Sequence, residues 1–195
     1  SLAATRYGVG LAIFAYGNSG SLTNLSNKVS SSGVVAADTT GVGTSREYPA
    51  AASYGGDKGI YGYGNSGSRV NMTNLVTNAG VIGTDVSGVG SARDELAAAG
   101  YGGDKAIFAY GTTGSSTNIK NLVNNAGVVA ADATGVGSAR QSLAAASYGG
   151  DKAIFAYGGT HVSNLVSNTG VVAADVTGVG TLRQYLGAAG YSISA

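Results

Sequence analysis

The chain has no cysteine and no tryptophan, and it has one proline, one methionine and one histidine in 195 residues. The absence of cysteine excludes disulfides, thiolate chemistry and Cys-bound zinc or iron–sulfur sites. With His161 as the single histidine, no His-based metal cluster can form, and a Ser-His-Asp triad would depend on this one residue in a short loop. We expect His161 to be an exposed loop residue. The sequence thus predicts no enzyme, no cofactor and no metal.

Charge is also scarce, because charged residues make up 11% of the chain and the net charge is +1. No basic run with interleaved aromatic residues is present, which argues against nucleic-acid binding. No apolar run approaches the length of a membrane span, and the first six residues contain no apolar core of a signal peptide, so no membrane insertion is expected. Since 44% of the residues are apolar, disorder is not expected either.

Glycine is abundant, with 34 residues, and its positions follow internal repeats. The phrase Ala-Ile-Phe-Ala-Tyr-Gly or a close variant occurs four times, and its tyrosines are spaced by 47 residues. These are Tyr16, Tyr63, Tyr110 and Tyr157. A second phrase, Gly-Val-Val-Ala-Ala-Asp or a variant, precedes Gly-Val-Gly and then an arginine in every repeat. Those arginines are Arg46, Arg93, Arg140 and Arg183.

A third phrase, Leu-Ala-Ala-x-x-Tyr, occurs five times with one variant and ends last at Tyr191. We therefore expect a single repeat domain with four units and an extra strand segment at 186–195. The four units cover residues 2–48, 49–95, 96–142 and 143–185. The extra segment could form part of a fifth blade, cap the last unit, or pair with another chain. The start at Ser1 resembles the middle of an array, which predicts further repeats or another domain before it.

Each unit is predicted to contain four short β-strands, which residues 96–101, 106–110, 121–125 and 128–132 illustrate. Gly102-Gly103-Asp104 supplies a tight turn between the first two. Along the second strand, Ile107 and Ala109 should face one side while Phe108 and Tyr110 face the other. Both faces are apolar, so the strand is expected to be buried between two sheets.

Four strands in about 47 residues match one blade of a β-propeller, so the predicted fold class is all-β, a propeller of four four-stranded repeats plus one extra strand. A parallel β-solenoid with two coils per repeat is the structural alternative. Gly-Val-Gly lacks the third glycine and the following helix of a dinucleotide-binding fingerprint, so we interpret it as a turn.

One stretch resembles the kelch-type repeat: Arg93, then Leu96 to Gly111 with its Gly-Asp-Lys turn, followed by Asn121-Leu-Val and Gly127-Val-Val. Gly158-Gly159 gives the paired glycines of that pattern once, whereas the other units have Gly-Asn or Gly-Thr and no unit has the usual tryptophan. The Gly/Ala/Asn-rich sequence of the repeats is similar to tandem repeats in virion and tail-associated proteins of marine cyanobacterial phages. This resemblance implies a virion or extracellular location.

Recurring acidic residues suggest structural anchors. Asp38, Asp85, Asp132 and Asp175 each precede an arginine by eight residues, and we expect them to be hydrogen-bonded turn anchors or partners of that arginine. A calcium site would need several carboxylates at one point, which one Asp per unit does not supply. The Asp-Lys pairs that begin at residues 57, 104 and 151 are expected to be solvated turn charges.

The loop after the second strand varies among the units in length and content, so recognition that differs between units should occur there, on one rim. The candidate recognition residues are Asn18, Ser19, Ser21, Asn65, Ser66, Arg69, Asn71, Thr112, Ser115, Asn118, Lys120, Thr160 and His161.

Two functions remain open from the sequence. The first is a non-enzymatic structural protein of a phage virion or tail fibre, with other assembly proteins as partners and self-association through the extra strand. The alternative is a lectin-like adhesin that binds host glycans through the variable loops and gains affinity from several sites.

Overall fold

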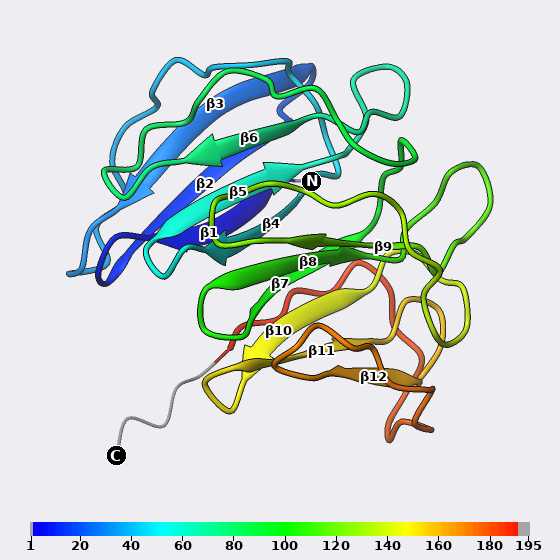
Figure 1. The fold of residues 1–195 in the computed structure, drawn as a ribbon. Coiled ribbons are helices and arrows are strands. Elements are labelled where there is room, and N and C mark those ends of the chain that lie inside the picture. The colour runs from blue at the N-terminus through cyan, green and yellow to red at the C-terminus, as the bar shows by residue number, and fades with distance from the viewer. Residues whose placement is uncertain (1, 191–195) are drawn as a thin grey trace.

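The computed structural model describes residues 2–190 and contains strands but no helix in this range, and hence no helix that could cross a membrane (Figure 1). The strands form four separate three-stranded antiparallel sheets, one in each unit. The first and second sheets contain β1 (Ala3–Tyr7), β2 (Leu11–Asn18), β3 (Leu22–Val29), β4 (Ala50–Tyr54), β5 (Lys58–Gly62) and β6 (Thr73–Val76). The third and fourth contain β7 (Ala97–Tyr101), β8 (Lys105–Ala109), β9 (Lys120–Val123), β10 (Ala144–Tyr148), β11 (Lys152–Ala156) and β12 (Ser163–Val166). The all-β repeat prediction is confirmed.

The pairing repeats from sheet to sheet. In the third sheet, Ala97 pairs with Ala109 and Tyr101 with Lys105, so the predicted Gly-Gly-Asp turn connects β7 to β8. β8 then pairs with β9, with Ala106 opposite Val123. The middle strand of every sheet is therefore the second strand of its unit, as expected for a meander.

The predicted fourth strand of each unit is wrong. The segment 128–132 contributes only isolated bridges at its two ends, from Val129 to Val123 and from the following Ala133 to Lys120. Between these bridges, the Asn121 side chain in β9 donates hydrogen bonds to the Ala130 carbonyl at 3.0 Å and to the Asp132 carboxylate at 2.9 Å. The Ala130 N–H also donates to the Leu122 carbonyl at 2.8 Å, so backbone and side-chain hydrogen bonds together hold this segment without a regular ladder.

Successive sheets lie side by side with their first strands adjacent, since β1 contacts β4, β4 contacts β7 and β7 contacts β10 (Figure 1). The tight turns are linked from one unit to the next, because Gly8, Gly55 and Gly102 each donate a backbone hydrogen bond of 2.7 Å to the turn aspartate of the following unit. All tight turns therefore share one edge of the molecule, and the variable loops share the opposite edge. Within residues 2–190 no sheet closes on itself and no complete propeller is formed.

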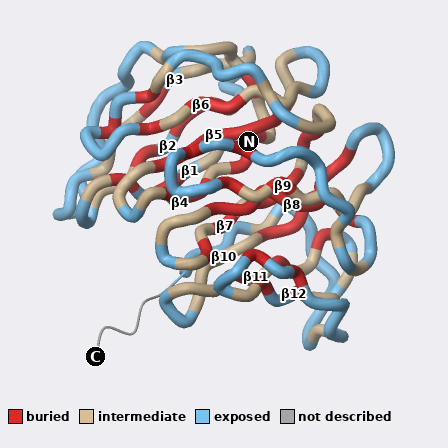
Figure 2. Tube along the Cα trace, viewed as in Figure 1, coloured by how far each residue is buried: buried red, intermediate tan, exposed pale blue. Residues whose placement is uncertain are grey.

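The hydrophobic core lies between the sheets. Three clusters of buried residues occur, and each combines side chains from two neighbouring units. In the first cluster, Ile13 and Tyr16 of unit 1 pack with Tyr61 and Val76 of unit 2. Figure 2 shows the buried positions along the strands and the exposed ones in the connecting loops. The prediction that the second strands are buried between two sheets is confirmed for the inner units.

The predicted face of Tyr110 is wrong. Phe108 packs against Tyr63 of the preceding unit, whereas Tyr110 packs against Phe155 of the following unit. The reason is a backbone φ of 64° at Tyr110, which breaks the alternation of the strand. The corresponding tyrosines of the other units have the same left-handed φ, between 63° and 65°.

The extra copy of the first-strand phrase forms no strand between residues 186 and 190, in contrast to the prediction, and Tyr191 lies outside the described residues. The segment lies beside β10, because a Cβ on Gly190 would be 2.5 Å from the Ser147 carbonyl oxygen. Residues 188–190 and the first strands of all four sheets line one cavity of about 330 Å³. The segment thus caps β10 at the position that the next first strand would take.

Candidate functional site

A buried arginine occupies each of the three interfaces between sheets. Arg46, Arg93 and Arg140 are fully buried, and each guanidinium lies over the left-handed tyrosine of its own unit, with the central carbon 4.0, 4.3 and 4.0 Å from the ring centroid. The tyrosine ring also contacts an aromatic ring of the next unit, at 5.2–5.4 Å between centroids. We call each such group an arginine cluster.

The next unit supplies the acceptor of each arginine Nη2, while the Nη1 groups of Arg46 and Arg140 donate to carbonyls of their own unit. Arg46 Nη2 donates to Asn74 Oδ1 at 2.7 Å, and Arg93 Nη2 donates to Asn121 Oδ1 at 2.6 Å. The third cluster differs, because Arg140 Nη2 donates to the Phe155 carbonyl at 3.4 Å. Each arginine therefore forms a hydrogen bond across the interface, to a side chain in the first two clusters and to a backbone carbonyl in the third.

The recurring aspartates join the same clusters. Asp132 accepts hydrogen bonds from the Ser91 backbone N–H at 2.9 Å and from its hydroxyl at 2.7 Å, and it lies 3.7 Å from Arg93 Nη1. The expected partner, Arg140, is not the one observed. Asp85, Asp132 and Asp175 thus anchor a backbone segment, as predicted, but this segment and the arginine belong to the preceding unit, because the two faces of a sheet meet different neighbours.

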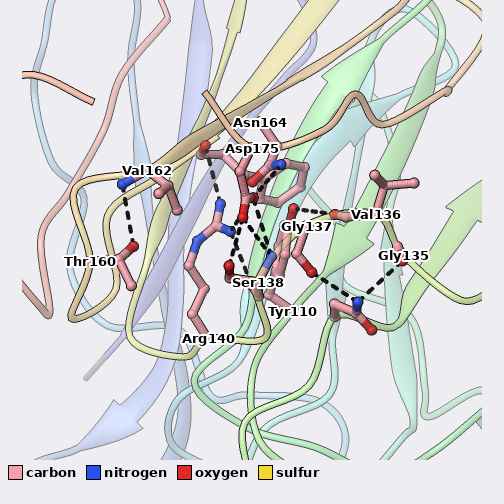
Figure 3. A network of polar contacts seen from close by, with 12 residues as sticks. Tyr110, Gly135, Val136, Gly137, Ser138, Arg140, Thr160, Val162, Asn164 and Asp175 are labelled. Carbon is pink, nitrogen blue, oxygen red and sulfur yellow. Dashed lines mark hydrogen bonds and ion pairs between the residues drawn. The ribbon is translucent and has the colours of Figure 1, made fainter. Parts of the chain in front are cut away.

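Figure 3 shows the third cluster. Ser138 and Asn164 both donate to the Asp175 carboxylate, at 2.6 and 2.9 Å from their side chains, while Tyr110 donates its hydroxyl to the Val136 carbonyl at 3.2 Å. Val136 is the centre of a Gly-Val-Gly phrase, which was predicted as a turn and forms a bend at Val136 and Gly137. The phrase therefore supplies the acceptor that orients the tyrosine beneath Arg140.

Burial and hydrogen bonding shift the pKa values of the cluster. Burial lowers the pKa of the Arg93 guanidinium, and the nearby tyrosine and carboxylate oppose that shift. Burial also raises the pKa of Tyr63 to about 12. For Asp85 and Asp132, burial raises the pKa, but hydrogen bonds outweigh it and the pKa is lower than usual. The folded state thus favours a charged carboxylate and a neutral tyrosine.

Within residues 2–190, unit 1 presents one half of a further arginine cluster without an arginine. Phe14 is 37% exposed, whereas the corresponding Tyr61, Phe108 and Phe155 are fully buried. Val35 is 56% exposed, whereas its counterparts are at most 9% exposed. Asn27 donates to the exposed Asp38 at 2.8 Å, as the corresponding pairs do in the other units. This acceptor face consists of Phe14, Asn27, Val35 and Asp38.

Unit 4 presents the other half. Arg183 lies over the Tyr157 ring at 4.4 Å, and Tyr157 donates its hydroxyl to the Val179 carbonyl at 3.3 Å, so the geometry of the inner clusters is kept. Arg183 is exposed, however, and has no carboxylate partner in the range 2–190. Thr181, at the position of Ser138, is exposed as well. This donor face consists of Tyr157, Thr181 and Arg183.

The candidate recognition residues lie along the loop edge, and most contact their own unit. Asn18 donates to Glu47, and both Asn65 and Arg69 donate to Asp94, at 2.9 Å each. The Asn71 and Asn118 amides donate to glycine carbonyls, the Thr112 hydroxyl accepts from Gly114, and Thr160 donates to Tyr157. Lys120 lies in β9 and reaches Gly170 of the next unit at 3.3 Å. Ser19, Ser21, Ser115 and His161 are exposed, and Ser66 is half-buried.

Sequence reasoning missed the asparagines of the clusters. Asn74, Asn121 and Asn164 are fully buried, each inside the apolar third strand of its unit. A polar residue that recurs at one position of a buried strand is a detectable signal, because it must find hydrogen-bond partners. The sequence could therefore have identified these positions, although not the arginine that they meet.

The chain matches no known protein family, and it matches no curated protein. Among residues 2–190, no group of three or more His, Asp or Glu side chains is arranged to hold a metal ion.

Proposed function

We propose that this chain is a non-enzymatic structural protein of a phage virion or tail fibre, in which the repeats form a rigid platform for protein contacts. The observation that carries the proposal is the position of the core, because all three buried clusters join neighbouring units. Bending the array would separate aromatic pairs and expose buried arginines, which is costly. The resemblance to repeats of phage virion proteins supports the location.

We further propose a kelch-like, propeller-type arrangement of the four sheets as blades. The shared cavity supports this, since first strands from all four sheets line it. Electron micrographs of the chain should then show an arc or ring around a central hole. A straight rod would contradict the arrangement.

The virion role is tested by mass spectrometry of particles purified from the phage that encodes the chain. Peptides of the chain should co-purify with the particles through a density gradient at a constant ratio to a capsid protein. Absence of the chain from washed particles would contradict the proposal. Hydrolysis of any substrate by the chain in a broad hydrolase screen would contradict it as well.

A lectin-like adhesin is the second candidate. The observation in its favour is that loops of different sequence share one edge, where Ser19, Ser115 and His161 are exposed. A glycan array should then show binding that is lost when Ser19, Ser115 and His161 are replaced by alanine. The matched control replaces the exposed Ser31 and Ser32 of the opposite edge by alanine and should bind normally.

A further inference from the structure

We propose that two copies of this chain associate end to end, with Arg183 of one copy entering the acceptor face of the other. The contact would be a fourth arginine cluster, formed between molecules. This inference goes beyond the proposed function, and it holds whether or not the chain belongs to a virion.

The acceptor face offers space for the incoming residues. A cavity of about 400 Å³ is lined by Phe14, Asn27 and Asp38, among others. At the inner interfaces, the corresponding aromatic, asparagine and aspartate side chains contact the tyrosine and arginine of the preceding unit. The second copy would thus place Tyr157 and Arg183 in this cavity, with Arg183 donating to Asn27 Oδ1.

The donor face is already arranged for this contact. Tyr157 holds the left-handed φ of 65°, and the Gly158 and Gly159 N–H groups donate to the Arg183 carbonyl at 3.1 Å. The guanidinium is therefore positioned before binding, so association requires little ordering of this side chain. The charges are also complementary, since Arg183 would meet Asp38 as Arg93 meets Asp132.

Residues 186–190 compete with this association. They lie where β1 of the second copy would pack against β10, and they form no strand. Residue 186 is half-buried and the other four are exposed, so the segment is held weakly. The end-to-end contact therefore requires this segment to move away.

The two faces differ, so the interface is heterologous and mixing experiments can test it. Sedimentation velocity of the full chain should show concentration-dependent association. Asp38→Ala and Arg183→Ala should each raise the dissociation constant by about 30-fold or more, because each removes one partner of a desolvated charge pair. Asp104→Ala and Lys105→Ala are the matched controls, since these residues pair in an exposed turn of unit 3, and they should associate like the unchanged chain.

An equal mixture of Asp38→Ala and Arg183→Ala should form dimers with the affinity of the unchanged chain and nothing larger. Each variant retains one intact face, so one contact can form and no further growth is possible. If the mixture remains monomeric while the unchanged chain associates, or if both variants associate normally, the proposed contact is wrong. Circular dichroism checks that both variants are folded.

A glycine pair tests the competing segment. Gly190→Val should push the segment off β10, because its Cβ would approach the Ser147 carbonyl to 2.5 Å, and association should become at least tenfold tighter. Gly187→Val is the control, since nothing lies within 4 Å of a Cβ there. If the unchanged chain and Gly190→Val are both monomeric at high concentration, the proposal is overturned.

Discussion

The buried arginine is the central residue of each interface, and its surroundings explain why arginine is present. A buried charge is tolerated only with partners, and here a tyrosine ring, an asparagine oxygen and a nearby carboxylate supply them. The planar guanidinium can stack on the ring while its edge donates hydrogen bonds, which the compact ammonium of lysine cannot do. The cluster therefore specifies both the residue type and the distance between sheets.

Replacing Arg93 by alanine is expected to lower the free energy of unfolding by about 3 kcal/mol, because a buried, partnered charge is removed and Asn121 loses its donor. Arg93→Lys should restore less than half of the loss. Urea unfolding followed by circular dichroism measures both. Lys105→Ala is the control, since this lysine and its salt-bridge partner Asp104 are both exposed, and its loss should change the free energy of unfolding little. Equal losses for Arg93 and Lys105 would contradict the role of the cluster.

Stability should decrease in acid because of the cluster aspartates. The pKa values of Asp85, Asp132 and Asp175 are lowered in the folded state, so these groups stabilise the fold above the unfolded pKa of about 3.9 and lose this contribution as the pH falls below it. The urea concentration at the unfolding midpoint, measured between pH 7 and pH 3, should therefore fall steeply below about pH 4, close to the pKa of an unfolded aspartate. Asp132→Asn should be less stable at neutral pH and show a shallower acid slope. An unchanged slope would argue against this linkage.

At the scale of elements, the strands and tight turns were predictable because their signals are local. Alternating apolar residues and Gly-Gly-Asp identified β7, β8 and the turn between them. The face of Tyr110 was not predictable, since the period of two assumes extended backbone, whereas this tyrosine has a left-handed φ, as does Tyr157, which has no following unit within residues 2–190. The partner of Asp132 was hidden for a related reason, because Arg93 lies in another unit and no local spacing connects the two.

The passages between units allow a test with two glycines. A Cβ on Gly88 would lie 1.9 Å from the Asn71 carbonyl oxygen, so Gly88→Ala should destabilise the fold by at least about 2 kcal/mol. Gly83→Ala is the matched change, since its nearest contact would be 3.5 Å away and the other units carry alanine there. It should be neutral or stabilise by about 0.4–1 kcal/mol. Thermal unfolding of both variants measures the change in stability. A similar loss of stability in the two variants would contradict the close approach of Gly88 to the Asn71 carbonyl oxygen.

At the scale of the whole molecule, the chain is a one-dimensional array in which each unit is stabilised by its neighbours. The inner sheets are covered on both faces, whereas the outer sheets each leave one face partly exposed, as Phe14 and Leu165 show at 37% and 41% exposure. Stability is therefore expected to be highest in the middle of the array.

Hydrogen exchange measured by mass spectrometry should reveal this gradient. Amides of β5 and β8 should be the slowest, and those of β2 and β11 should exchange at least tenfold faster, because the outer sheets can open without exposing two cores. Uniform protection across the four middle strands would indicate a single cooperative unit instead.

The division of each arginine cluster between two units has a consequence for how such a gene can change. Every unit carries the donor half on one face and the acceptor half on the other, so a duplicated or deleted stretch of 47 codons leaves all remaining contacts in register. Recombination between the near-identical repeats would preserve folding wherever the crossover occurs within the period. The number of units can therefore change under selection for length, while the arginine clusters that join neighbouring units stay the same.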